Sequence, residues 1–282
     1  MSDGVEIQRE RANRVHGDPT EGLWDYHYTS DPLIRYLRDR RLHRALSELD
    51  KRGRLDVVKQ SALLVCGGVG GEGTFLANQG FADVTVSDLS EKAMELCRRF
   101  DGRLKTRVLN AEAMSEVEDG SYDLVFVQDG LHHLPRPVLG FTEMLRVARS
   151  AVVVIEPHSG VVARTIGKQW EVDGDAVNYV FRWNRSMLEQ TTRSYLLQED
   201  AEVITCRFFD HNLVVNRVVS KLPLPRRSQL LAAKATYGML HPAAPVGNMM
   251  VGIVLKPPRP SPQRLVARIG RLNAPPSTSR CC

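Results

Sequence analysis

Val65-Cys66-Gly67-Gly68-Val69-Gly70-Gly71-Glu72-Gly73: this glycine-rich run is the strongest indication of the fold class of the chain. The apolar run 62–66 predicts a buried strand, and the residues that follow the glycines, through Gln79, predict a helix. Glycines in such a turn permit positive φ and let a ligand approach the backbone closely. The amide N–H groups at the start of the helix then point toward that ligand. We therefore interpret the stretch as the ligand-binding turn after the first strand of an α/β domain.

Strand and helix patterns alternate along the chain after this turn. Further strands are predicted at 83–87, 106–109, 122–127, 151–155, 201–209 and 248–255, and helices at 90–100, 137–147 and 184–197. Alternation of this kind predicts a doubly wound, mostly parallel sheet with helices on both faces.

An acidic residue follows the second predicted strand at the position a nucleoside ligand requires. Asp88 lies 20 residues after Gly68, where a carboxylate can accept hydrogen bonds from both ribose hydroxyls. The alternative is that Asp88 only caps the next helix, for which Ser90 is a rival. The glycine turn and Asp88 together favour the ribose role.

Several stretches, taken in order, resemble the class I S-adenosylmethionine-dependent methyltransferases that act mostly on small molecules. The resemblance covers residues 61–157, and its motifs are 66–70, 87–90, 110–113, 120–125, 131–134, 143–147 and 155–157. It implies a seven-stranded sheet of order 3-2-1-4-5-7-6 with an antiparallel last strand, and S-adenosyl-L-methionine as the cofactor. It also implies a set of cofactor-binding residues: Cys66, Gly67, Gly68, Gly70, Asp88, Leu89, Asn110, Ala111 and Gln128.

Three positions depart from the pattern of this family. Cys66 replaces the first glycine of the family's loop, and Leu64 replaces the acidic residue that usually precedes that loop. Asn110 replaces an aspartate that often lies near the adenine amine. Asparagine can still accept a hydrogen bond through its carbonyl oxygen. The other two departures keep open an alternative function, a catalytically inactive cofactor-binding or partner-binding protein on the same fold.

Two adjacent histidines are the candidate catalytic residues. His132 and His133 follow the fourth predicted strand, which neighbours the first strand where the winding of the sheet reverses and ligands bind. Histidine is the usual general base near neutral pH, but either residue could instead be structural. We expect His133 to pack on the cofactor side and His132 to lie nearer the acceptor. No metal site is expected.

The methyl acceptor is expected to be a small molecule, and O-methylation is favoured over N- or C-methylation. The net charge of +5 arises from 256–282, which holds six basic and no acidic residues, so the rest of the chain is nearly neutral. This charge pattern and the sequence Gln128-Asp129-Gly130-Leu131 after the fourth strand argue against a nucleic-acid substrate. The Gly-x-Gly-x-x-Gly pattern at 68–73 also fits a dinucleotide-dependent oxidoreductase, although nothing downstream looks like a hydride-transfer site.

The domain organisation is predicted from composition and helix signals. We expect a flexible N-terminus at 1–20, a helical cap at 21–58, a methyltransferase domain at 59–256 with an insertion near 210–247, and a basic, Pro-rich tail at 257–282. Asp31 followed by Pro32 predicts the start of the cap helix.

Two aromatic segments flank the predicted domain core. They could line the acceptor pocket or seal the cap onto the sheet, and they comprise Trp24, Tyr26, His27, Tyr28, Trp170, Tyr179, Phe181 and Trp183. Five scattered cysteines and the absence of an apolar leader or membrane-spanning run predict a cytoplasmic protein. The oligomeric state stays open.

Overall fold

A seven-stranded sheet of order β3-β2-β1-β4-β5-β9-β8 forms the centre of the protein. A computed structural model describes residues 2–17, 28–166, 169–173, 176–196, 201–210 and 217–257. The strands are β1 Ser61–Leu64, β2 Asp83–Asp88, β3 Lys105–Val108, β4 Tyr122–Gln128, β5 Ala148–Pro157, β8 Glu202–Phe208 and β9 Met249–Leu255. All are mutually parallel except β9, which is antiparallel to both of its neighbours. The predicted strand order and antiparallel last strand are therefore confirmed.

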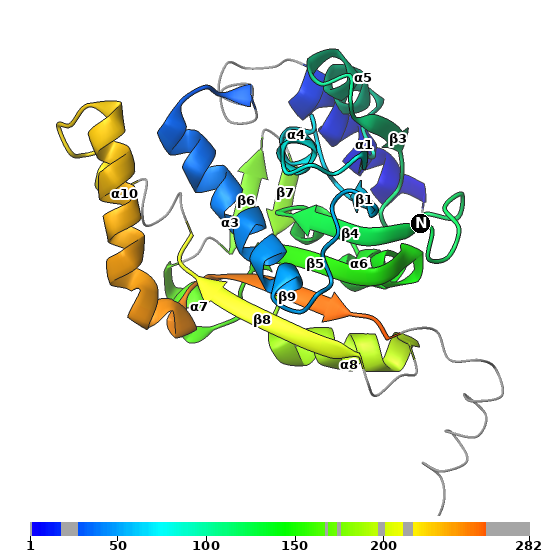
Figure 1. Cartoon of the computed structure of the whole chain (residues 1–282). Helices are drawn as coiled ribbons and strands as arrows, with labels where there is room; N and C mark the ends of the chain where they lie inside the picture. The colour runs from blue at the N-terminus through cyan, green and yellow to red at the C-terminus, as the bar shows by residue number, and fades with distance from the viewer. Residues whose placement is uncertain are drawn as a thin grey trace, which may run out of the picture.

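Helices cover both faces of this sheet, as Figure 1 shows. The helices α3 Pro32–Asp50, α4 Gly71–Asn78 and α5 Glu91–Phe100 bury their apolar residues against one face. The helices α6 Pro137–Val147 and α8 Arg185–Leu196 cover the other. Both faces of the central strands are thus buried, which explains their almost continuous apolar sequences.

The cap helix α3 begins where its sequence predicts. The Asp31 side chain accepts hydrogen bonds from the backbone N–H groups of Leu33 and Ile34, and Pro32 occupies the first turn. One apolar stripe of α3, which includes Leu42 and Leu49, packs on the sheet and on α4.

The first residues of the chain correct our expectation of a flexible N-terminus. Ser2–Gly17 form helix α1, which packs against α5. The Ser90 hydroxyl, which caps α5, donates a hydrogen bond to the Asn13 carbonyl oxygen at 2.7 Å. A polar segment with weak periodicity gives no local signal for such docking, because the contact partner lies far along the chain. Residues 18–20 of the predicted N-terminal segment, residues 21–27 of the predicted cap and most of the predicted tail, 258–282, lie outside the described residues.

Two insertions sit at the carboxyl end of the sheet. After β5 come helix α7 Val161–Ile166 and an antiparallel hairpin, β6 Trp170–Asp173 and β7 Ala176–Tyr179, which the sequence does not predict. After β8 come α9 Arg217–Val219, α10 Arg226–Leu240 and the short 3-10 helix η3 His241–Val246. Helix α10, which lies within the segment 210–247, packs beside α3 (Figure 1).

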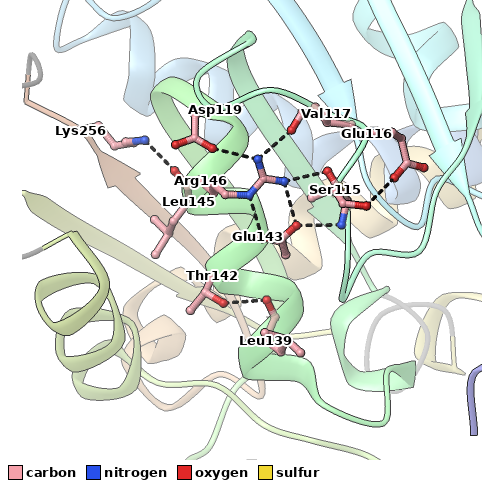
Figure 2. Close-up of polar contacts among 11 residues, drawn as sticks. Ser115, Glu116, Val117, Asp119, Leu139, Thr142, Glu143, Leu145, Arg146 and Lys256 are labelled. Atoms are coloured by element: carbon pink, nitrogen blue, oxygen red, sulfur yellow. Dashed lines mark hydrogen bonds and ion pairs between the residues drawn. The ribbon is translucent and has the colours of Figure 1, made fainter. Parts of the chain in front are cut away.

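Arg146 connects the end of α6 to the loop before β4 through hydrogen bonds and ion pairs (Figure 2). Its guanidinium donates to the carbonyl oxygens of Val117 and Met114, each at 2.7 Å, and pairs with Glu143 and Asp119. The Arg146 hydrogen bonds hold the pKa of Glu143 below its usual range. This part of the resemblance motif 143–147 therefore supports the fold and lies outside the site described below.

Candidate functional site

The carboxyl ends of β1, β2, β3 and β4 meet at one edge of the sheet, because these four parallel strands are neighbours. The predicted cofactor-binding residues follow these strands: Cys66, Gly67, Gly68 and Gly70 after β1, Asp88 and Leu89 at β2, Asn110 and Ala111 after β3, and Gln128 at β4. The fold thus brings the whole set to the edge where the winding reverses, the usual place for a ligand in such sheets.

Asp88 is fixed against the glycine turn. Its Oδ2 atom accepts a hydrogen bond from the Gly68 backbone N–H at 3.0 Å, and its Oδ1 atom accepts from the Ser90 N–H at 3.0 Å. The Ser90 hydroxyl itself caps α5 by accepting from the Ala93 N–H. Asp88 is only partly buried, and a carboxylate has about four lone-pair positions, so its oxygens can accept further donors.

Gly70 is required chiefly by packing. It has a φ of +91°, and a Cβ atom built on it would lie 2.4 Å from the Cys97 sulfur on α5. A side chain at this position would therefore strain the left-handed backbone and enter the core beneath the turn.

The Gly70→Val variant is therefore expected to lose about 2–4 kcal/mol of unfolding free energy, from overpacking and from a strained left-handed backbone. Urea denaturation followed by circular dichroism measures this loss. Gly53→Val is the matched control, since Gly53 has a φ of +62° and no atom within 4 Å of the built Cβ. An equal loss in both variants would contradict the packing explanation.

The turns after β1 and β4 touch each other. A Cβ built on Gly130 would lie 2.5 Å from the Cβ of Cys66, so only glycine fits there. Cys66 adopts a φ of +53°, which is uncommon for a residue with a side chain. Burial raises the pKa of its thiol well above the ordinary value, so the sulfur stays protonated and acts as a small apolar group.

The residues after β3 contribute unequally to the site. The Asn110 carbonyl oxygen accepts a hydrogen bond from the Glu112 N–H at 3.0 Å, which leaves a second lone pair for a ligand amine. Ala111 is buried in the core and supports the turn from below.

Gln128, which is a predicted site residue, forms a polar pair with Glu72, which is not. The Gln128 side-chain N–H donates to Glu72 at 2.9 Å. Within the described part of the chain, the Gln128 carbonyl oxygen is buried and has no hydrogen-bond partner. A buried acceptor without a donor fits a bound molecule that carries an N–H or O–H group. Glu72 lies in the first turn of α4 and was not predicted as a site residue.

Glu156, at the end of β5, organises the turn after β4. The fully buried carboxylate accepts from the backbone N–H groups of Gly130 and Leu131, and it lies 2.5 Å from His132 Nδ1. Burial alone would lower the pKa of His132, but the charge and hydrogen bond of Glu156 outweigh it and raise that pKa to about 9. His132 is therefore an imidazolium at neutral pH. Glu156 could have been found from the sequence, because it is an acidic residue in an otherwise apolar strand.

His133 is the more accessible of the two histidines. Its side chain is 42% exposed, whereas that of His132 is 5% exposed. His133 Nδ1 lies 3.7 Å from Glu171 and 3.3 Å from the Asn178 amide, both on the β6–β7 hairpin. The structure thus corrects the expected arrangement, in which His133 was the packed residue.

The two histidines and Glu171 also form a possible donor set for a cation. One donor atom from each of the three lies within 4.8 Å of the others. Imidazole and carboxylate groups are common ligands of divalent transition metals. No metal site is predicted from the sequence, because Glu171 lies on a hairpin with no local signal that places it beside the histidines.

Of the aromatic residues in the two predicted segments, some pack in the interior and others are exposed to solvent. The Tyr28 hydroxyl donates to the Val69 carbonyl oxygen and its ring stacks on Phe100 at 4.3 Å, so Tyr28 seals the cap onto the glycine turn. Trp183 is fully buried, while Trp170 and Tyr179 are exposed and face each other across the hairpin. Phe181 packs edge-on against Trp183. Trp24, Tyr26 and His27 lie outside the described residues.

Arg41 connects the cap helix to this edge of the sheet. Its buried guanidinium lies 2.5 Å from the carboxylate of Asp129, the residue directly after β4. Asp129 has a φ of +53°. Sequence reasoning missed the pair, because the two residues are 88 positions apart and each alone looks like an ordinary surface charge.

The family assignment rests on the same segment that carries the site. Residues 63–155 match the family model of the methyltransferase domain. Residues 63–155 therefore carry a methyltransferase domain, and the strand order of the sheet is that of the class I S-adenosylmethionine-dependent methyltransferase fold. The matched residues run from β1 through β5 and so include the glycine turn, Asp88 and both histidines. No curated protein matches the chain in sequence.

Solved structures share the fold of this methyltransferase domain at low sequence identity. One is from the Haloferax volcanii complex of the Trm112 methyltransferase activator with a methyltransferase, with 13% identity, a TM-score of 0.57, and coverage of 92% of this chain and 98% of that one. Magnesium protoporphyrin IX methyltransferase of Synechocystis PCC 6803, solved with bound SAM, has 14% identity, a TM-score of 0.52, and coverage of 90% and 97%. A Haemonchus contortus phosphoethanolamine N-methyltransferase has 15% identity, a TM-score of 0.54, and coverage of 89% and 60%. Within the described residues, no helix is long and apolar enough to span a membrane.

Proposed function

We propose that this protein transfers a methyl group from S-adenosyl-L-methionine to a small-molecule acceptor, with an oxygen as the favoured methylated atom. The observation that carries the proposal is the Asp88 carboxylate, held against the Gly68 N–H at the edge where the winding reverses. The donor supplies a methyl group on a positively charged sulfur, so positioning of the acceptor accounts for much of the catalysis.

Four groups of the chain are suited to hold the donor. Asp88 accepts the ribose hydroxyls, and the second lone pair of Asn110 accepts the adenine amine. Gln128 offers its unpartnered carbonyl oxygen to the amino-acid end. Glu72 supplies at that end the carboxylate that the family usually has where Leu64 stands.

The two histidines take different roles in this proposal. His133 is the general base for the acceptor hydroxyl, because its ring is accessible and faces Glu171 and Asn178. His132 is a positioning residue, since its imidazolium is bound by Glu156 and has no free site for a proton at neutral pH. A cytoplasmic location fits the free cysteines Cys66, Cys97 and Cys206.

Asp88→Ala is expected to weaken binding of S-adenosylhomocysteine by roughly 10- to 150-fold, which corresponds to about 1.5–3 kcal/mol for a lost charge-assisted hydrogen bond. Isothermal titration calorimetry with the folded variant measures the change. Asp83→Ala removes a carboxylate from the opposite end of the same strand and is the matched control, expected to bind normally. Unchanged affinity in Asp88→Ala would remove the ribose assignment. A wild-type protein that does not bind S-adenosylhomocysteine would refute the proposed function and favour a partner-binding protein on this fold.

A further inference from the structure

A basic cleft opens between α3, the end of β8 and the α10–η3 insertion. Its volume is about 850 Å³, within the usual range for small-molecule sites. The residues of this cleft that matter here are Tyr36, Arg40, Arg207, Phe208, Lys234 and Tyr237. Because β8 is parallel to β5, its carboxyl end lies at the same edge of the sheet as the glycine turn.

The charge of this cleft has one sign. Among the described residues that line it, five are arginine or lysine and none is aspartate or glutamate; the five are Arg40, Arg41, Arg44, Arg207 and Lys234. Arg41 and Arg44 are paired with Asp129 and Glu48. Among the residues that the structure describes, Arg40, Arg207 and Lys234 have no carboxylate partner within 4.0 Å. Cations gathered without counter-ions raise the local concentration of anions.

Aromatic rings hold two of these cations in place. The Arg40 guanidinium lies 3.4 Å from the ring centroid of Tyr237, and the Lys234 ammonium lies 5.5 Å from that of Tyr36. A guanidinium stacked on a ring by its face keeps its N–H edge for an acid group. The rings also provide apolar surface on which a flat ligand can pack.

Arg41 belongs both to this cleft and to the methyltransferase site. It lines the cleft and pairs with Asp129, which directly follows the strand that ends in Gln128. A molecule bound in the cleft therefore adjoins the turn that we assign to the donor and acceptor.

We propose that the basic cleft binds the acid group of the methyl acceptor, and that the acceptor is an anionic small molecule with an apolar, aromatic body. This inference rests on the proposed function. Arg40, Arg207 and Lys234 bind the carboxylate or phosphate, and the rings of Tyr36 and Phe208 pack against the body.

Isothermal titration of the full chain, saturated with S-adenosylhomocysteine, tests the proposal with three matched probes. These are 2-naphthoate, 2-naphthyl phosphate and the neutral 2-naphthamide. We expect at least one anion to bind more than tenfold tighter than the amide, and the tighter anion identifies the acid group. We expect the double variant Arg207→Gln/Lys234→Gln to bind that anion at least tenfold more weakly than the wild type does. Arg227→Gln, on the same helix α10 but outside the cleft, is the control and should have no effect.

The outcomes separate this inference from the proposed function. Equal binding of the amide and both anions would overturn the inference, as would unchanged anion binding in the double variant. In either case, normal binding of S-adenosylhomocysteine would leave the methyltransferase proposal intact. If the wild type does not bind S-adenosylhomocysteine, the proposed function is refuted instead. Any anion binding measured in the absence of S-adenosylhomocysteine would then show only that the cleft is an anion site.

Discussion

His133→Ala is expected to lower methyl transfer by roughly 10²–10⁴-fold while leaving the affinity for S-adenosylhomocysteine unchanged. The reason is that the variant removes the accessible imidazole that would accept the acceptor proton and keeps the Glu156 contacts of the turn. Turnover can be measured by mass spectrometry as methylated product formed from labelled donor with cell extract as the source of acceptors. Tyr179→Ala, an exposed residue of the neighbouring hairpin, is the control and should retain activity.

Two results would contradict the assignment of His133. Near-native turnover in His133→Ala would leave positioning as the source of catalysis. Loss of wild-type activity in EDTA, restored by a divalent metal, would instead assign His133 to the donor set it forms with His132 and Glu171.

Glu156→Ala is expected to lower the unfolding free energy by about 3–5 kcal/mol near neutral pH, because it removes the carboxylate that stabilises the buried His132 imidazolium and leaves two backbone N–H groups without their acceptor. Urea denaturation followed by circular dichroism gives the loss. Glu112→Ala is a matched control, since Glu112 is also a buried carboxylate that accepts a backbone N–H and pairs with a cation, Arg136.

The loss in Glu156→Ala should depend on pH in one direction. The pKa of His132 is raised from 6.5 to about 9, so its ionisation stabilises the fold fully below pH 6.5 and ceases to do so as pH rises through 9. The difference between wild type and Glu156→Ala should therefore shrink between pH 6.5 and 9.5. The difference for Glu112→Ala should stay constant there, because arginine remains charged. A constant difference for Glu156→Ala would show that His132 is not its charged partner.

Local pattern was sufficient to predict most of the fold. The alternation of apolar strands with helices, the glycine turn and the Asp31–Pro32 cap each lie within a few residues of what they determine. Asp88 could be predicted as a site residue for the same reason, because the chain from Gly68 to Asp88 is one helix and one strand. Periodicity and turn chemistry act over such distances.

The side-chain pairs and the cleft around that framework depend on the tertiary structure. The pairs Arg41–Asp129 and His132–Glu156 join different elements, and Glu171 reaches the histidines only because the β6–β7 hairpin folds over them. The basic cleft likewise exists only where α3, β8 and α10 meet. In the sequence these are isolated charges with no periodicity. Their partners and burial depend on how separate elements pack, and that packing also separates the buried, charged His132 from the accessible His133.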